Sequence, residues 1–250
     1  MKDNTILKLD KLSFGYSNKE ILNNISLDFK EGEFVHLLGA NGSGKSTLFN
    51  IILGFLDPNL GVVSIDDKNI KNYTIKERAR IISYVSQVKN PIFAFTVEEF
   101  LEMANYSKNT SENDEISVNY ALNMFDLQKF KHRKITNLSG GELQRVYIAR
   151  AILQNTKIII LDEPLNNLDM KYQINILHNL RKLCEENNRL VLMSIHDINL
   201  SRLYSTRRIY LNQGKFSEES SEFIPQLNDV YETSFRVIEE QDKLVIPEKI

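Results

Sequence analysis

Hydrophobic and polar positions alternate near the start of the chain, and this period of two predicts an N-terminal antiparallel sheet. The alternation runs over residues 6–14 and returns, after a turn, over 25–29. Residues 34–38 form instead an almost continuous apolar run, which is typical of a strand buried on both faces. We interpret His36, inside this run, as a core histidine rather than a ligand.

Apolar runs and helical patterns then take turns along the rest of the chain. The further strands are predicted at 62–65, 81–85, 157–161 and 190–195, with a terminal hairpin at 208–216. The helices are predicted at 47–55, 172–184 and 196–204, and capping-box spacings at Thr74-x-x-Glu77 and Thr96-x-x-Glu99 open two more. Strands that alternate with helices indicate an α/β fold with a mostly parallel sheet.

The segment 90–150 differs from its surroundings because it is predicted to be mostly helical. Its polar stretch, 107–117, is expected to form an exposed connection between helices. We see no internal repeat, so we expect one domain over 1–250. Residues 1–89 and 151–250 would form its core, with 90–150 as a helical insertion.

Composition narrows the class of protein without naming a function. The 250 residues are 42% hydrophobic and 26% charged, which is ordinary for a globular protein. A net charge of −2 gives no basic footprint for nucleic acid. Cys184 is the single cysteine and is expected to be a buried apolar residue, which excludes an internal disulfide and a Cys-rich metal site. With no long apolar run or signal-peptide pattern, we expect an intracellular soluble protein able to dock onto a membrane protein.

A glycine-rich loop follows the apolar run 34–38 and matches the P-loop pattern G-x-x-x-x-G-K-[ST]. Backbone N–H groups of such a loop face phosphate oxygens, and the helix behind it points its positive end at the same anion. Lys45 would reach the β and γ phosphates, and Ser46 would hold Mg²⁺. The candidate nucleotide-binding residues here are Gly39, Asn41, Gly42, Ser43, Gly44, Lys45, Ser46 and Thr47.

Two adjacent carboxylates, Asp162 and Glu163, end the apolar run 158–161. A strand that ends in Asp completes a P-loop site, so Asp162 is a candidate ligand of Mg²⁺, directly or through water. Glu163 is a candidate general base for an attacking water. An acid pair at a helix start before Pro164 is the alternative, but it would not explain the apolar run.

The segment Leu138-Ser139-Gly140-Gly141-Glu142 supplies a second anion-binding helix start. Upstream of the Asp-Glu pair, it resembles the signature of ATP-binding cassette (ABC) ATPases. That resemblance implies a P-loop NTPase of the ABC type, with an N-terminal antiparallel β subdomain and a helical subdomain that carries the signature. It also implies a homodimer in which the signature of one subunit, here Ser139, Gly140, Gly141 and Glu142, closes on the ATP held by the other.

Four further residues match positions of the same family. Tyr16 resembles the aromatic that stacks on adenine, and Gln87 resembles the glutamine that contacts Mg²⁺ or water and couples to the membrane partner. Asp169 resembles the D-loop aspartate, and His196 the switch histidine at the γ-phosphate. The resemblance thus implies catalytic roles for Glu163, His196, Gln87 and Lys45, and metal contacts by Ser46, Gln87 and Asp162.

Several residues depart from the usual family pattern. Ala40 stands where many relatives have Pro, which we expect to be mild. Asn166 and Asn167 replace the usual Ser-Ala before Leu-Asp, which affects interface detail rather than activity. Residues 98–103 depart from the pattern of the segment that meets the permease.

Residues 194–200 and the tail, 227–238, resemble importers of iron-siderophores, haem and vitamin B12. The resemblance implies an ATP hydrolase at the cytoplasmic face of the membrane, joined to transmembrane permease subunits and indirectly to an extracellular or periplasmic substrate-binding protein. An exporter subunit and a soluble ABC ATPase of DNA repair or translation are the alternatives. A nucleotide-sensing module without turnover is opposed by Glu163 and His196.

Overall fold

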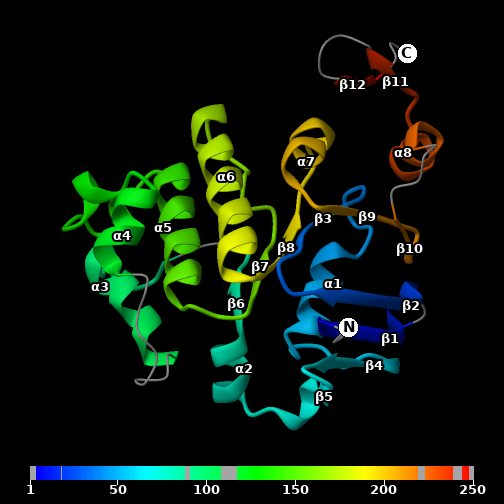
Figure 1. The fold of residues 1–250 in the computed structure, drawn as a ribbon, viewed down its shortest axis with the longest axis horizontal. Coiled ribbons are helices and arrows are strands. Elements are labelled where there is room, and N and C mark those ends of the chain that lie inside the picture. Colours follow the sequence, from blue (N-terminus) through cyan, green and yellow to red (C-terminus); the bar gives the residue numbers. More distant parts are fainter. Residues whose placement is uncertain are drawn as a thin grey trace.

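The computed structural model describes residues 4–17, 19–87, 91–107, 117–218, 223–238 and 244–247. The connection predicted at 107–117 falls almost entirely outside these residues. Within the described ranges, strands and helices alternate along the chain (Figure 1).

A six-stranded sheet forms the centre of the fold, with the strand order β10-β9-β3-β8-β7-β6. Its strands are β3 (Phe34–Leu38), β6 (Ile82–Val85), β7 (Ile158–Leu161), β8 (Leu190–Ser194), β9 (Arg207–Asn212) and β10 (Lys215–Glu218). Five of them run parallel, and only β10 is antiparallel, to β9. The expected mostly parallel sheet and terminal hairpin are confirmed.

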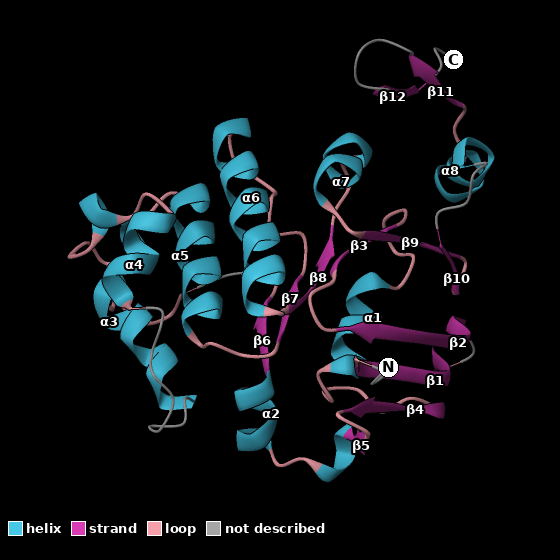
Figure 2. Cartoon of the chain, viewed as in Figure 1, coloured by secondary structure: helices cyan, strands magenta, loops and turns pink. Residues whose placement is uncertain are grey.

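The predicted N-terminal antiparallel sheet is also present (Figure 2). It has the order β2-β1-β4-β5, with β1 (Thr5–Tyr16), β2 (Lys19–Lys30), β4 (Leu60–Ile65) and β5 (Lys68–Asn69). The hydrophobic pattern predicted β4 as a strand but did not place it beside β1. A further antiparallel pair joins β11 (Phe235–Ile238) and β12 (Leu244–Pro247).

The α-helices have bounds close to those predicted from the pattern. They are α1 (Lys45–Ile52), α2 (Ile75–Ile81), α3 (Val97–Glu102), α4 (Val118–Met124), α5 (Gly140–Leu153), α6 (Met170–Asn187), α7 (Ile198–Tyr204) and α8 (Phe223–Tyr231). Both predicted capping boxes, at Thr74 and Thr96, make their two hydrogen bonds. The helix predicted at 196–204 starts later, because Asp197 accepts the N–H of Leu200 and caps α7.

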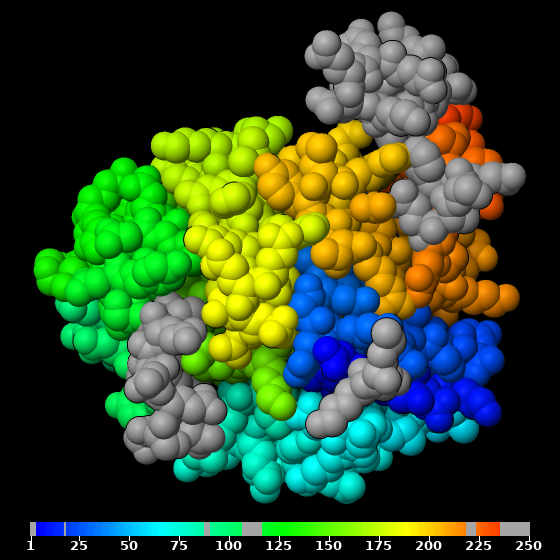
Figure 3. Space-filling model, in the orientation of Figure 1, coloured from blue at the N-terminus to red at the C-terminus, as the bar shows by residue number. Residues whose placement is uncertain are grey.

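Two hydrophobic clusters lie on the two faces of the central sheet, because successive strand residues point to opposite faces. In β7, Ile158 and Ile160 join α1 and the antiparallel sheet, whereas Ile159 and Leu161 join the cluster of α3 to α7. Each fully buried aliphatic side chain contributes roughly 1.5–3 kcal/mol. The helical segment and the antiparallel strands consequently occupy opposite flanks of the molecule (Figure 3).

Candidate nucleotide site

The P-loop lies between the end of β3 and the start of α1, as predicted. Gly39, Gly42 and Gly44 all have positive φ, at 155°, 77° and 108°. A Cβ at Gly39 would lie 2.5 Å from the Leu211 carbonyl oxygen, so a larger residue would displace β9. Gly44 caps α1 without any side-chain hydrogen bond, which leaves the first backbone N–H groups of the helix available to an anion.

Lys45 turns back over this loop rather than out to solvent. Its side chain is only 5% exposed, and Nζ donates to the carbonyl oxygens of Gly39 at 2.8 Å and Ala40 at 3.0 Å. Burial lowers the pKa of Lys45, while the charges of Glu163 and Asp162 oppose that shift. The ammonium therefore lies within electrostatic reach of both acids, at the centre of the site.

Asp162 lies at the end of β7 and is 2% exposed. Ser194, the last residue of β8, donates from Oγ to Asp162 Oδ1 at 2.7 Å and accepts the N–H of Glu163 at 2.7 Å. These bonds orient both acids at once. Ser194 was not predicted for this position from the sequence; its signal was one hydroxyl in an otherwise apolar strand.

Glu163 has a positive φ of 49°, which is uncommon for a residue with a side chain. Its Oε2 accepts Gln87 Nε2 at 2.8 Å and Asn166 Nδ2 at 2.6 Å. Its Oε1 lies 2.9 Å from His196 Nε2. Residues far apart in sequence, which follow β6, β7 and β8, thus converge on one carboxylate.

Ser139 caps α5 with a complete capping box. Its Oγ accepts the N–H of Glu142 at 3.3 Å, and Glu142 Oε2 accepts the N–H of Ser139 at 2.8 Å. Burial alone would raise the pKa of Glu142, but these bonds from Ser139 hold it below its ordinary value. A Cβ at Gly141 would lie 3.0 Å from the Asn167 oxygen, whereas a Cβ at Gly140 would meet open space.

The remaining predicted residues lie outside this convergence of side chains. Tyr16 ends β1, is 51% exposed, and packs edge-to-face on Phe14 with 4.8 Å between ring centroids. Asp169 precedes α6 and makes no side-chain cap bond there. Ser46 and Thr47 lie in the first turn of α1. The contacts of Tyr16 and of the start of α5 with a nucleotide therefore stay predictions.

The donor set beside the P-loop fits Mg²⁺. Among the described residues, no group of three or more His, Cys, Asp or Glu side chains could hold a metal ion alone. Ser46, Gln87 and Asp162 offer one hydroxyl, one amide oxygen and one carboxylate. Mg²⁺ is commonly bound by one or two carboxylates together with substrate phosphates and water, so a mixed oxygen set of this kind suits it.

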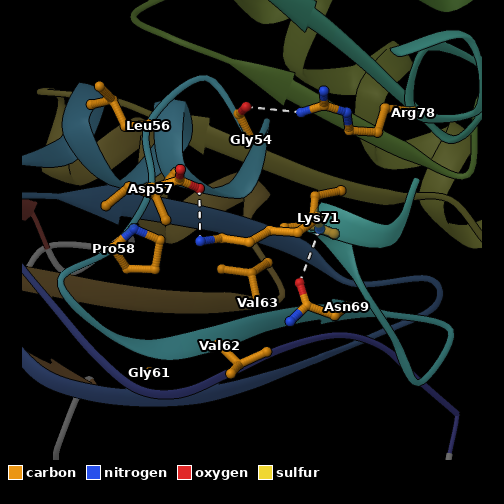
Figure 4. A pocket seen from close by; sticks show the side chains of 12 residues that line it. Gly54, Leu56, Asp57, Pro58, Gly61, Val62, Val63, Asn69, Lys71 and Arg78 are labelled. Atoms are coloured by element: carbon orange, nitrogen blue, oxygen red, sulfur yellow. Dashed lines mark hydrogen bonds and ion pairs between the residues drawn. The ribbon is translucent and has the colours of Figure 1, made fainter. Parts of the chain in front are cut away.

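Two cavities lie near the two ends of α1. One, of about 540 Å³, adjoins the P-loop and is lined by 40–43, 212–214 and 230–232. The other, of about 290 Å³, lies at the opposite end of the helix, where Arg78 donates to the oxygens of Leu53 and Gly54 (Figure 4). Arg78 thereby caps the helix C-terminus, so this second cavity is not part of the phosphate site.

In the part of the chain that the structure describes, no helix has the length and apolar character needed to cross a membrane.

Comparison with known proteins identifies the family of this chain. Residues 22–166 match the family model described as ABC transporter. The Bacillus subtilis petrobactin import ATP-binding protein YclP is 33% identical, over 97% of this chain and 94% of its own length. The hemin import ATP-binding protein HmuV of Rhodopseudomonas palustris is also 33% identical, over 86% of this chain and 82% of its own length. YvrA of Bacillus subtilis, an uncharacterized ABC transporter ATP-binding protein, is 36% identical over 83% of this chain, which spans 48% of its length.

A solved structure shows the same fold. The ATP-binding cassette MJ0796, solved as a dimer in a post-hydrolysis state with ADP and phosphate, has a TM-score of 0.74 and 32% identity to this chain. The alignment covers 85% of this chain and 98% of that one.

Proposed function

This chain belongs to the ABC transporter ATP-binding family, and we propose that it energises a membrane importer of an iron complex. It is an ATP hydrolase of the ABC class. The observation that carries the proposal is the convergence of Gln87, Asn166 and His196 on Glu163, beside a preformed P-loop. The petrobactin and hemin relatives support an iron complex as the cargo.

In this proposal the P-loop residues 39–47 bind the phosphates and Lys45 neutralises their charge. Tyr16 stacks on adenine. Ser46, Asp162 and Gln87 would hold Mg²⁺, which would supply neutralisation of phosphate charge. The start of α1 supports this assignment, because Gly44 makes no side-chain cap bond to its first backbone N–H groups.

Glu163 acts as the general base of hydrolysis. It takes a proton from water as the water oxygen bonds to the γ-phosphorus and the bond from phosphorus to the β–γ bridging oxygen breaks. The products are ADP and phosphate. In this proposal His196 contacts the γ-phosphate and orients the base, and its Nε2 lies 2.9 Å from Glu163 Oε1.

We propose that two copies of the chain form a homodimer. In it, Ser139, Gly140, Gly141 and Glu142 of one subunit close on the nucleotide of the other, with Asp169 at the interface. The exposed position of Ser139 and the open space at Gly140 support this, because both leave room for a ligand from outside the chain. ATP would close the dimer, and hydrolysis would reopen it.

The dimer would lie at the cytoplasmic face of the membrane, bound to permease subunits that receive cargo from an extracellular or periplasmic binding protein. Crosslinking in intact membranes, followed by identification of the attached chains, tests this. We expect a multi-spanning permease. Recovery with ribosomes or DNA would contradict the importer while leaving the nucleotide site in place.

Glu163→Gln tests the catalytic assignment. The variant should bind ATP, accumulate as an ATP-bound dimer on size exclusion, and lose turnover, because the amide cannot accept the proton from water. Hydrolysis at the wild-type rate would show that Glu163 is not the base.

A further inference from the structure

Asn166 is an exposed residue at the point where the chain departs from its family's usual serine, and it contacts the proposed base directly. We propose that Asn166 is a positioning residue that assigns the work of general base to one oxygen of Glu163, Oε1. This inference rests on the proposed role of Glu163.

The two carboxylate oxygens of Glu163 have different hydrogen-bond partners. Each carboxylate oxygen offers about two acceptor sites. Oε2 already accepts two amide donors, from Gln87 at 2.8 Å and Asn166 at 2.6 Å, so it is saturated. Among the residues that the structure describes, the partner of Oε1 is His196, at 2.9 Å. A water that is to lose its proton to Glu163 therefore finds its free acceptor site on Oε1, next to His196.

Asn166 is better placed than Gln87 to hold this arrangement. It is three residues from Glu163 in the same tight turn, which the Asn166 N–H closes by donating to the Glu163 carbonyl at 3.4 Å. Gln87 follows β6, an element distant from Glu163 in the sequence. The amide of Asn166 is thus tethered locally to the carboxylate that it orients.

The turn itself is anchored on both sides. Gln144 of α5 donates to the Pro164 oxygen at 2.8 Å, and Gln173 of α6 donates to the oxygens of Leu165 and Leu168 at 3.2 and 3.0 Å. Because these bonds hold the backbone without help from the Asn166 side chain, truncating that side chain should leave the fold intact.

The test is the steady-state ATPase of the purified chain. Asn166→Ala should lower kcat about tenfold and leave KM for ATP within about twofold, since the lost bonds orient the base and not the nucleotide. Asn166→Asp keeps the size but puts a second carboxylate beside Glu163, and should lower kcat further. Asn119→Ala, at an exposed site on α4, is the matched control and should match wild type.

A double-mutant cycle separates this role from a contact across the dimer. In the Glu163→Gln background, Asn166→Ala should lower the residual rate less than about twofold, and the ATP-trapped dimer should still form, because Asn166 acts through Glu163. Loss of the trapped dimer, additive losses of rate, or a rise in KM with unchanged kcat would each overturn the inference. An active wild-type chain that binds no permease would contradict the importer and leave this inference standing.

Discussion

Two helices in this molecule begin at glycine-rich turns, and they begin in opposite chemical states. At α1, Gly44 caps the helix without a side-chain bond to the first N–H groups. At α5, Ser139 and Glu142 satisfy each other in a capping box. The two starts also pack into different hydrophobic clusters and lie apart in the fold (Figure 1).

In the proposed dimer, this difference divides the phosphate site between two chains. A free helix start with a buried lysine is ready for an anion within one subunit. A self-capped, exposed start is stable while empty, and it retains hydroxyl and backbone groups that a second subunit's nucleotide can engage. The four predictions below test this division, beginning with the largest expected effect.

Removing the Lys45 ammonium at the start of α1 should have the largest effect on ATPase activity. Lys45→Ala should lower kcat/KM for ATP at least about a hundredfold, because a buried charge aimed at the phosphates is lost. ATPase assays and binding of a fluorescent nucleotide measure it. Lys182→Ala, at an exposed site on α6, is the control. Comparable activity in the two variants would contradict the role of the P-loop start.

Removing the Ser139 hydroxyl at the start of α5 should have the second-largest effect. Ser139→Ala should destabilise the fold by about 1 kcal/mol through loss of the cap, and it should also lower kcat by about thirtyfold. Thr74→Ala is a matched control, because Thr74 and Glu77 form the same capping box on α2. We expect an equal loss of stability there with normal ATPase. Equal kinetics in the two variants would assign Ser139 a purely structural role.

Filling the empty space beside the capped start should have a smaller effect. A Cβ at Gly140 meets no atom within 4 Å in the single chain, so Gly140→Ala should leave the melting temperature unchanged. It should still lower kcat about tenfold if a partner's nucleotide occupies that space. Wild-type activity, with normal ATP-dependent dimers on size exclusion, would mean that nothing packs there.

Much of this comparison is readable from the sequence, because it depends on local patterns. Capping-box spacing located the starts at Thr74 and Thr96, and the glycine pattern located the P-loop. Alternation located the N-terminal strands, and apolar runs located strands of the central sheet. The bounds of α1 were less accurate, because it begins at Lys45 rather than at Thr47 and ends three residues earlier than expected.

The contacts that depend on packing between distant segments were not predicted. Ser194 joins Asp162 to Glu163 only because β7 and β8 are neighbours in the sheet. Arg145 is buried because it donates to the carbonyl oxygens of Phe125 at 2.6 Å and Asp126 at 3.0 Å. No period or spacing encodes such pairs, since each partner comes from a different element.

The two starts also differ in what supports them. Behind the P-loop, β3 contains His36. Its ring shares a hydrogen bond with Ser201 Oγ at 3.0 Å and packs edge-to-face on Phe34. Burial, with a smaller contribution from Arg208, lowers the pKa of His36 to about 3. Behind the signature, the guanidinium of Arg145 holds α5 by donating to the carbonyl oxygens of Phe125 and Asp126.

Acid should therefore weaken the support of the P-loop. Between about pH 6.5 and 3 the unfolded chain binds a proton at His36 that the folded chain does not. The free energy of unfolding therefore decreases as the pH is lowered through this range, by at most about 1.4 kcal/mol per pH unit. The melting temperature should fall less in His36→Phe than in wild type between pH 7 and pH 5, and the difference should be about 3–5 °C. Ser201→Ala, which keeps the buried ring, should lower the melting temperature and retain the wild-type slope. A slope that is unchanged in His36→Phe would show that acid acts elsewhere, and that both helix starts have supports of the same kind.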